Sequence, residues 1–459
     1  MAGSSSDRNV TRRVALALLG GGVAGGAALG LSRRDMLSFL RRDAETDDAF
    51  RVMRRPYPSE PGREVSALGF GCGAKLPVKN RDKRCIDEEL ATELMDFAVR
   101  HGVNYFDTGY NYHEGESERF LGRVLPRYPR ESILLADKMP TWLVKKPEDA
   151  PRIFEEQLRK CRVEYFDNYL LHSVNKLGEY ERVYHQMGVL DYLKEQKAKG
   201  RIRHLGFSFH GTGETLLRVL KDCSWEMVQV MINALENRWN PDSLKVMKIL
   251  AERNIPIFIM QPLAGGRAAS LNKEAQRILA REGGGMSAAE WGFRYAMSFP
   301  NVLTVLSGMS RMEWVVENIR TLSAGRFRPF DAHDREVYGR VVDAYMKYKT
   351  IPCTSCRYCV PCPYGVAIPE IFAWWNAFAG AGRLPTREGA NDSQKLRREF
   401  LASYSNAVRP GCGPEKCIGC RKCLVACPQW TFRISDEIRK IDQALAGIRA
   451  DYVKKGGRP

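Results

Sequence analysis

Short apolar runs that end in polar or glycine residues recur along the middle of the chain, and amphipathic segments lie between them. Eight runs occur between about residue 60 and residue 325: EVSALGF, VNYFD, SILLADK, FDNYLLHS, IRHLGFS, MVQVMIN, IPIFIMQ and VLTVLSG. The intervening segments, such as 87–102 and 241–254, carry apolar residues at helical spacing. Eightfold alternation of strand and helix predicts an α/β fold, a (β/α)8 TIM barrel.

The rest of the chain divides around this barrel. We predict a basic N-terminal segment and linker at 1–48, the barrel at 49–330, a linker helix at 331–350, a cysteine-rich domain at 351–432 and a C-terminal helix at 433–459. A chain of 459 residues is long enough for two or three domains and a large core.

The N-terminal segment has the features of an export signal. Arg12 and Arg13 precede an apolar, glycine- and alanine-rich run at 14–31, which resembles a twin-arginine signal. Glycine-rich helices are poor membrane spans, so export is favoured over a stable anchor. We expect a periplasmic or membrane-associated location, with any membrane contact confined to 14–31. A cytoplasmic location is the alternative.

The chain is basic, with 71 Lys and Arg against 54 Asp and Glu and a formal net charge of +17. Such a charge would suit an acidic partner or a membrane surface. However, the basic residues are spread along the chain, and no nucleic-acid-binding motif accompanies them. We therefore expect no nucleic-acid partner.

Polar residues terminate the apolar runs, and in a barrel of this kind the C-terminal strand ends carry the chemistry. Four of these residues form a candidate acid–base set: Asp107, Tyr112, Lys138 and His172. A lysine cation would lower the pKa of a neighbouring tyrosine from its usual value of about 10, and an aspartate would orient the lysine. A histidine beside the phenol can bind a substrate carbonyl. The set suits proton transfer to a carbonyl that receives hydride, or the reverse reaction.

The order and spacing of these four residues, in FDTGYNY, LLADKMP and YLLHS, resemble the aldo/keto reductase family over roughly 60–325. The resemblance implies a nicotinamide coenzyme, NADP or NAD, at the barrel mouth and a small-molecule carbonyl or alcohol substrate, with Tyr112 as the general acid or base. It also implies that Ser208 and Gln229 hold the carboxamide and that Leu263 and Gly265 approach the pyrophosphate.

The same resemblance assigns the adenosine phosphate end of the coenzyme to the segment after the last strand. The implied contacts are Gly308, Met309, Ser310, Arg311, Glu317 and Asn318. Phosphate groups bind readily at a helix N-terminus, which this segment would provide. Arg311 is the obvious cation for a 2′-phosphate, and the choice between NADP and NAD stays open.

Nine of the thirteen cysteines lie between 353 and 427 in short spacings. CIGCRKCLVACP matches the C-x2-C-x2-C-x3-C-P run of bacterial ferredoxins, and CTSCRYCVPCP is one residue shorter. In two-cluster proteins the fourth cysteine of each run binds the other cluster. We therefore predict two [4Fe–4S] clusters, one held by Cys353, Cys356, Cys359 and Cys427 and one by Cys417, Cys420, Cys423 and Cys362.

Zinc is the alternative metal, but a tetrahedral zinc site uses two cysteine pairs rather than two quartets that each end in proline. Cys412 is left over and is expected to be a bystander. The barrel and the cysteine runs together resemble aldo/keto reductases with a C-terminal 4Fe–4S ferredoxin domain, over about 50–432.

This resemblance implies an oxidoreductase. Its clusters would conduct electrons, with a protein electron carrier as a further partner, or would brace the structure. Nicotinamide gives two electrons as hydride whereas a cluster takes one at a time, and no flavin motif is visible to split the pair. The alternative function is a non-enzymatic electron-transfer or interaction subunit that uses the barrel as a scaffold.

Overall fold

The computed structural model describes residues 50–73, 75–79, 85–386, 391–429 and 432–457. The predicted export signal lies outside these residues, so export and membrane contact stay predictions. Within the described part, no helix is long and apolar enough to cross a membrane.

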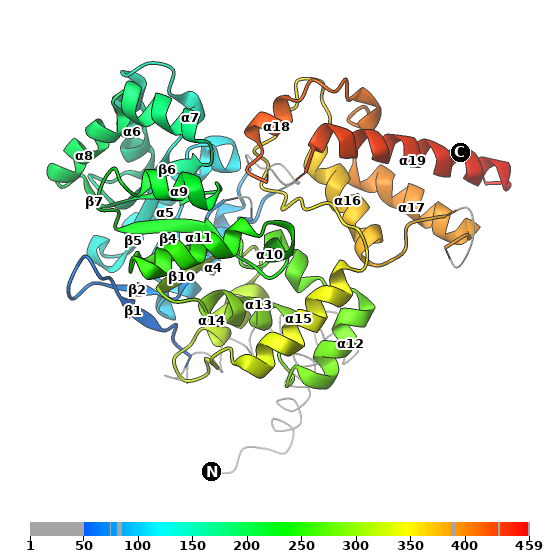
Figure 1. Cartoon of the computed structure of the whole chain (residues 1–459), viewed down its shortest axis with the longest axis horizontal. Helices are drawn as coiled ribbons and strands as arrows, with labels where there is room; N and C mark the ends of the chain where they lie inside the picture. The colour runs from blue at the N-terminus through cyan, green and yellow to red at the C-terminus, as the bar shows by residue number, and fades with distance from the viewer. Residues whose placement is uncertain (1–49, 74, 80–84, 387–390, 430–431, 458–459) are drawn as a thin grey trace, which may run out of the picture.

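Eight parallel strands close into a barrel, which confirms the predicted fold (Figure 1). Their order around the barrel is β10-β3-β4-β5-β6-β7-β8-β9. The strands are β3 (Leu68–Gly71), β4 (Tyr105–Asp107), β5 (Leu134–Met139), β6 (Phe166–Val174), β7 (Ile202–Phe209), β8 (Met227–Met231), β9 (Ile257–Met260) and β10 (Val302–Ser307). Almost every strand residue is buried, because one face packs inside the barrel and the other packs under helices.

The first apolar run, EVSALGF, is not one strand as predicted. Its first half forms β2 (Glu64–Ser66), which pairs antiparallel with β1 (Arg54–Pro56), and its second half forms β3. Tyr57 and Val65 from this hairpin are buried against Tyr105 and Phe258 of the barrel strands. The hairpin therefore helps to fill one end of the barrel with apolar side chains and leaves the other end for chemistry.

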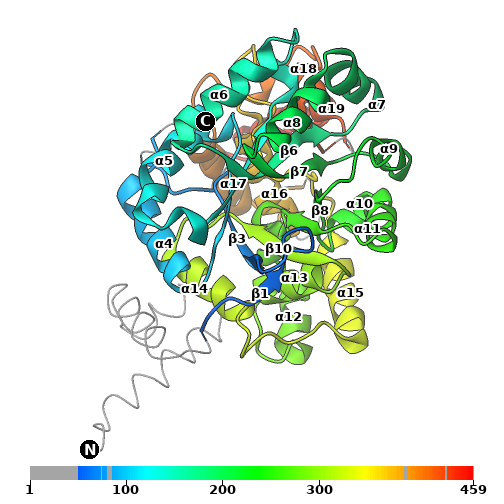
Figure 2. The same cartoon turned by 90° about the vertical axis from the view of Figure 1, so that its left-hand side faces the viewer.

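Amphipathic helices surround the strands (Figure 2). They include α4 (Glu88–Arg100), α5 (Glu116–Val124), α6 (Asp149–Cys161), α8 (Val189–Ala198), α9 (Gly213–Val219), α11 (Asp242–Glu252), α13 (Ala288–Met297) and α14 (Met312–Thr321). In α4, the Asp87 side chain accepts a hydrogen bond from the Leu90 backbone at the N-terminus, and Leu94 and Ala98 face the core. These features explain why a helix forms here and which face it buries.

The chain leaves the barrel through α15 (Ala332–Met346), which packs against α12 (Lys273–Glu282). The C-terminal domain then follows beside the barrel, drawn in orange and red in Figure 1. Its helices are α16 (Ile368–Gly380), α17 (Gln394–Ala407), α18 (Lys422–Ala426) and α19 (Ile434–Lys454). Phe372, Phe400 and Ile441 belong to its apolar core, against which several of the cysteines pack.

Candidate active site

Three adjacent strands bring the predicted acid–base residues together. Asp107 ends β4, Lys138 lies in β5 and His172 lies in β6, and these strands are neighbours in the barrel. The Lys138 ammonium lies 2.8 Å from Asp107 Oδ1, with both side chains buried. Tyr112 begins a short 3-10 turn after β4, and its ring centre lies 4.9 Å from the Lys138 nitrogen. The Tyr112 and His172 ring centres are 6.0 Å apart.

Burial sets the protonation states of these groups. Desolvation raises the pKa of Tyr112, and the charge of Asp107 adds to this effect. Desolvation also holds the pKa of His172 well below its usual range, and the Lys138 cation acts in the same direction. The sequence-based expectation of a lowered tyrosine pKa is therefore wrong, because desolvation, which raises the pKa, is the largest effect on the Tyr112 phenol. Tyr112 is protonated and His172 is neutral near pH 7.

Ser208 and Gln229 face each other across the paired strands β7 and β8, and both are buried. Ser208 Oγ accepts a hydrogen bond from the Ser173 backbone at 2.7 Å. Gln229 Oε1 is buried without a hydrogen-bond partner among the described residues. An unpaired amide oxygen suits an N–H donor such as a carboxamide, so this pair has the right chemistry for the end of the coenzyme assigned to it.

The segment predicted for the adenosine phosphate end joins β10 to α14. Gly308, Ser310 and Arg311 are partly or fully exposed, whereas Met309 is buried in the core. Asn318 donates a hydrogen bond to Ser307 Oγ at 3.0 Å, so its amide is used within the barrel. Glu317 is desolvated, which raises its pKa, and it bonds to the Ser287 side chain.

A second cation at this end was not predicted. A Cβ placed on Gly308 would collide with the Lys75 side chain, so Lys75 covers this glycine. Lys75 is partly buried, and desolvation lowers its pKa. The available signal was its position just after the end of β3, on the same face as the other strand ends. Lys75, Arg311 and the N-terminus of α14 together fit an anionic group.

The barrel mouth is covered by the segment that carries the first cysteines, which sequence reasoning missed. Tyr358 shares a hydrogen bond of 2.7 Å with Nε2 of His172 and a further hydrogen bond with the Tyr112 hydroxyl. Its ring meets Trp142 edge-on, with 5.9 Å between ring centres. The Thr354 carbonyl oxygen packs directly on Gly265. This segment therefore contacts both the acid–base residues and Gly265, one of the predicted pyrophosphate contacts.

Several of the predicted cluster cysteines lie near one another: Cys427 near Cys353 and Cys356, and Cys423 near Cys417, Cys420 and Cys362. Burial raises the pKa of the Cys427 thiol to about 12, and the neighbouring thiols of Cys356 and Cys353 act in the same direction. Burial and Cys417, with smaller contributions from Cys420 and Cys362, raise the pKa of Cys423 to about 11. These contacts agree with the predicted ligand sets, and the division of the cysteines between two clusters stays a prediction. None of the thirteen cysteines forms a disulfide bond.

Two further observations bear on the cysteines. A cavity of about 190 Å³ is lined by Cys359, Cys362, Cys417, Cys420 and Cys423. Backbone N–H groups donate to sulfur at Cys353 (3.4 Å, from Ser355) and at Cys427 (3.3 Å, from Gln429), as suits thiolate ligands. Within the described ranges, no three His, Cys, Asp or Glu side chains converge tightly enough to hold a single metal ion. The N–H···S hydrogen bonds and the spacing of the cysteines are the features that fit iron–sulfur clusters.

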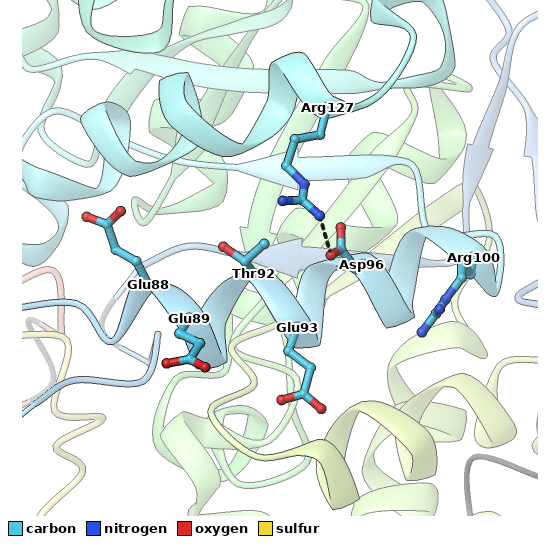
Figure 3. Close-up of a pocket in the computed structure, with 7 residues that line it drawn as sticks. All are labelled: Glu88, Glu89, Thr92, Glu93, Asp96, Arg100 and Arg127. Carbon is cyan, nitrogen blue, oxygen red and sulfur yellow. Dashed lines mark hydrogen bonds and ion pairs between the residues drawn. The ribbon is translucent and has the colours of Figure 1, made fainter.

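A wide surface depression of about 850 Å³ lies on the outer face of α4 rather than at the strand ends (Figure 3). Its lining consists of Thr92 and six charged residues: Glu88, Glu89, Glu93, Asp96, Arg100 and Arg127. Arg127 pairs with Asp96 at 2.8 Å, and Arg123 pairs with Glu88 at 2.6 Å. These neighbouring charges neutralise one another, so the depression is a solvated helix face.

Comparison with known proteins matches two family models to this chain. The aldo/keto reductase family matches residues 68–334, and the 4Fe-4S dicluster domain matches residues 352–432. A probable aldo-keto reductase 1 of Glycine max is 30% identical over 155 residues, which are 32% of this chain and 42% of that protein. The uncharacterized oxidoreductase YqkF of Bacillus subtilis is 23% identical over 308 residues, covering 60% of this chain and 92% of that protein.

Among solved structures, the holo form of the aldo-keto reductase AKR11C1 from Bacillus halodurans matches with a TM-score of 0.51 and 21% identity. The match covers 64% of this chain and 97% of that one. At this identity the likeness supports the barrel fold alone.

Proposed function

Since this chain belongs to the aldo/keto reductase family and carries a C-terminal 4Fe-4S dicluster domain, we propose that it is an oxidoreductase that reduces a carbonyl group at the barrel mouth. The observation that carries the proposal is the convergence of Asp107, Lys138, Tyr112 and His172 at neighbouring strand ends. A protonated tyrosine beside a paired lysine can donate a proton to a carbonyl oxygen, and the same group would take the proton back in alcohol oxidation.

Each residue has a separate task in this reaction. The Tyr112 hydroxyl gives its proton to the carbonyl oxygen as that oxygen gains negative charge. The Lys138 cation, held by Asp107 at 2.8 Å, stabilises the tyrosinate that remains. His172 is neutral, so its ring nitrogen Nε2 can orient the substrate oxygen by a hydrogen bond without adding a charge to the site.

The reducing electrons have two expected sources. NADP or NAD would supply a hydride, with its phosphates near Lys75, Gly308 and Arg311, and the predicted clusters would supply single electrons. Ser208 and Gln229 would hold the nicotinamide carboxamide only when the segment over the mouth has moved. The protein electron carrier also stays a prediction.

The test is a Tyr112→Phe variant of the anaerobically purified holoprotein, with 4-nitrobenzaldehyde as the carbonyl probe and NADPH, NADH or dithionite as the reductant. We expect a loss of turnover of about 10² to 10⁴-fold, with unchanged iron content. Tyr110→Phe is the matched control, because the Tyr110 hydroxyl bonds to Glu156 outside the site at 3.1 Å.

Undiminished turnover in the Tyr112→Phe variant would contradict the proposed role. The non-enzymatic alternative expects a different result, in which neither the wild-type protein nor a variant without the Tyr358 ring, Tyr358→Ala, reduces the probe with any of the three reductants. The position of Tyr358 within the site is the observation that favours this alternative.

A further inference from the structure

Tyr358 comes from the C-terminal domain but lies in the barrel site. Its phenol oxygen bonds to both groups that the proposed reaction uses to hold the substrate: Nε2 of His172, at 2.7 Å, and the hydroxyl of Tyr112. Trp142 contacts both the Tyr358 ring and the His172 ring, with centres 5.9 and 5.0 Å away. The phenol is therefore enclosed by the site rather than resting on its rim.

A carbonyl substrate must place its oxygen against the same two groups, since one gives the proton and the other orients the acceptor. Only one oxygen atom can occupy that position. We propose that Tyr358 occupies the position of the substrate's reacting oxygen, so that the C-terminal domain closes the barrel site and substrate binds only after Tyr358 has left. This inference rests on the proposed function.

A second contact on the same segment supports the inference. Four residues before Tyr358, the Thr354 carbonyl packs so closely on Gly265 that a single added carbon atom would collide with it. Thr354 is buried, and so are Ser208 and Gln229. The segment therefore contacts the barrel both at Gly265, a predicted pyrophosphate contact, and at Tyr112. Opening the substrate position and opening the coenzyme path would be one event.

The position of Tyr358 in the sequence links this event to the first predicted cluster. Tyr358 lies between Cys356 and Cys359, two of the residues that would hold that cluster. A bound cluster would fix the short backbone around Tyr358, so the phenol would follow the position of the cluster-bearing segment. The C-terminal domain thus acts as a lid, and the hydrogen bonds of the Tyr358 hydroxyl hold this lid closed.

The test compares wild-type holoprotein with Tyr358→Phe, which removes only the hydroxyl, and Tyr358→Ala, which removes the ring. Tyr364→Ala is the matched control, because Tyr364 lies in the same cysteine-rich segment and is 43% exposed. Binding of NADPH is followed by nicotinamide fluorescence without a carbonyl compound, and the KM for 4-nitrobenzaldehyde is measured separately. The first readout does not depend on turnover.

We expect the NADPH dissociation constant and the aldehyde KM to fall on the order of tenfold in Tyr358→Phe and further in Tyr358→Ala, with Tyr364→Ala unchanged. The reason is that affinity is reduced by the fraction of molecules that are closed, and a hydrogen bond of ordinary strength sets that fraction. The kcat of Tyr358→Phe should stay within about threefold of wild type, because the Tyr358 hydroxyl only occupies the position of the substrate oxygen and takes no part in the reaction.

Three results would overturn the inference. The first is a large fall in kcat for Tyr358→Phe with both binding constants unchanged, since Tyr358 would then act in the reaction itself. The second is an equal shift in Tyr364→Ala, which would mean general loosening of the domain. The third is no difference between the Tyr358 variants and wild type, including no NADPH binding by any of them. Intact turnover in Tyr112→Phe would instead count against the proposed function. The comparison of NADPH binding between wild type and the Tyr358 variants would still test whether Tyr358 closes the site.

Discussion

The phenol oxygen of Tyr358 and Nε2 of His172 are 2.7 Å apart, although 186 positions separate the two residues in the sequence. This hydrogen bond joins the cysteine-rich domain to the residue that would orient a substrate in the barrel. A substitution at this contact in one domain should therefore change a measurable property of the other domain. It also means that the mouth of this barrel is shaped by a second domain and not by barrel loops alone.

A pair of neighbouring glycines can test how the cysteine-rich segment is seated. Gly265 and Gly266 both have positive φ, at 70° and 100°, so alanine at either position costs about 1 to 2 kcal/mol of backbone strain. Only at Gly265 would the new methyl group collide with Thr354, whereas nothing lies within 4 Å at Gly266. We expect Gly265→Ala to raise hydrogen exchange in peptides that span Cys353–Cys359.

Gly266→Ala serves as the control for backbone strain in this experiment. It should lower thermal stability by a similar amount while exchange in the Cys353–Cys359 peptides stays at the wild-type level. Equal exchange in the two variants would mean that Thr354 does not hold the segment against the barrel.

The strand ends and the cysteine runs could be predicted because each is encoded locally. Asp107, Lys138 and His172 each end or follow an apolar run, and parallel strands bring such ends together. Tyr358 could not be predicted in this way. Its neighbours in the sequence are cysteines, and its partners lie on strands formed by a distant part of the chain. No periodic pattern relates the two.

Two smaller misses have equally physical causes. Lys75 follows β3 at a turn with no regular pattern, so its approach to Gly308 depends on the closure of β10 against β3. The sign of the Tyr112 pKa shift depends on burial, which a sequence shows only indirectly. The residue types of the site were readable from the sequence, but the degree of desolvation was not.

The buried pair of Lys138 and Asp107 leads to a prediction about stability. Both side chains are almost fully buried, and their charged atoms are 2.8 Å apart. Removing one partner of such a pair leaves an uncompensated charge, which typically costs about 3 to 5 kcal/mol. We expect Lys138→Met to lower the thermal unfolding temperature of the holoprotein clearly at pH 8.

The pH dependence of this loss follows from Asp107. Desolvation already raises the folded-state pKa of Asp107 above its unfolded value, and the Lys138 cation opposes that rise. Without Lys138 the folded-state pKa rises further. An acid with a raised folded-state pKa stabilises the fold below its unfolded pKa, and this contribution is lost as the pH rises through the folded-state pKa. The deficit of Lys138→Met relative to wild type should therefore widen from pH 5.5 to pH 8.5.

A second substitution separates charge from packing in that variant. Adding Asp107→Asn to Lys138→Met removes the uncompensated carboxylate, so the pH dependence of the deficit should largely disappear. A deficit in the single variant that is constant across this range would show that packing, and not the charge of Asp107, determines the loss.

Two cysteines of the C-terminal domain distinguish cluster ligands from a bystander. Cys427 lies beside Cys353 and Cys356 and its sulfur accepts a backbone hydrogen bond, whereas Cys412 is predicted to bind no iron. We expect Cys412→Ser to keep about eight iron atoms per chain after anaerobic purification and Cys427→Ser to keep about four, with loss of one of two cluster signals in the electron paramagnetic resonance spectrum.

The Cys427→Ser variant also tests the link between the first cluster and Tyr358. Because Cys356 and Cys359 lie on either side of Tyr358 in the sequence, loss of this cluster should weaken the hold of Tyr358 on the barrel site and strengthen NADPH binding. Equal iron content in the two variants, or zinc in place of iron, would contradict the ligand assignment. Unchanged NADPH binding in Cys427→Ser would show that the cluster does not control the position of Tyr358.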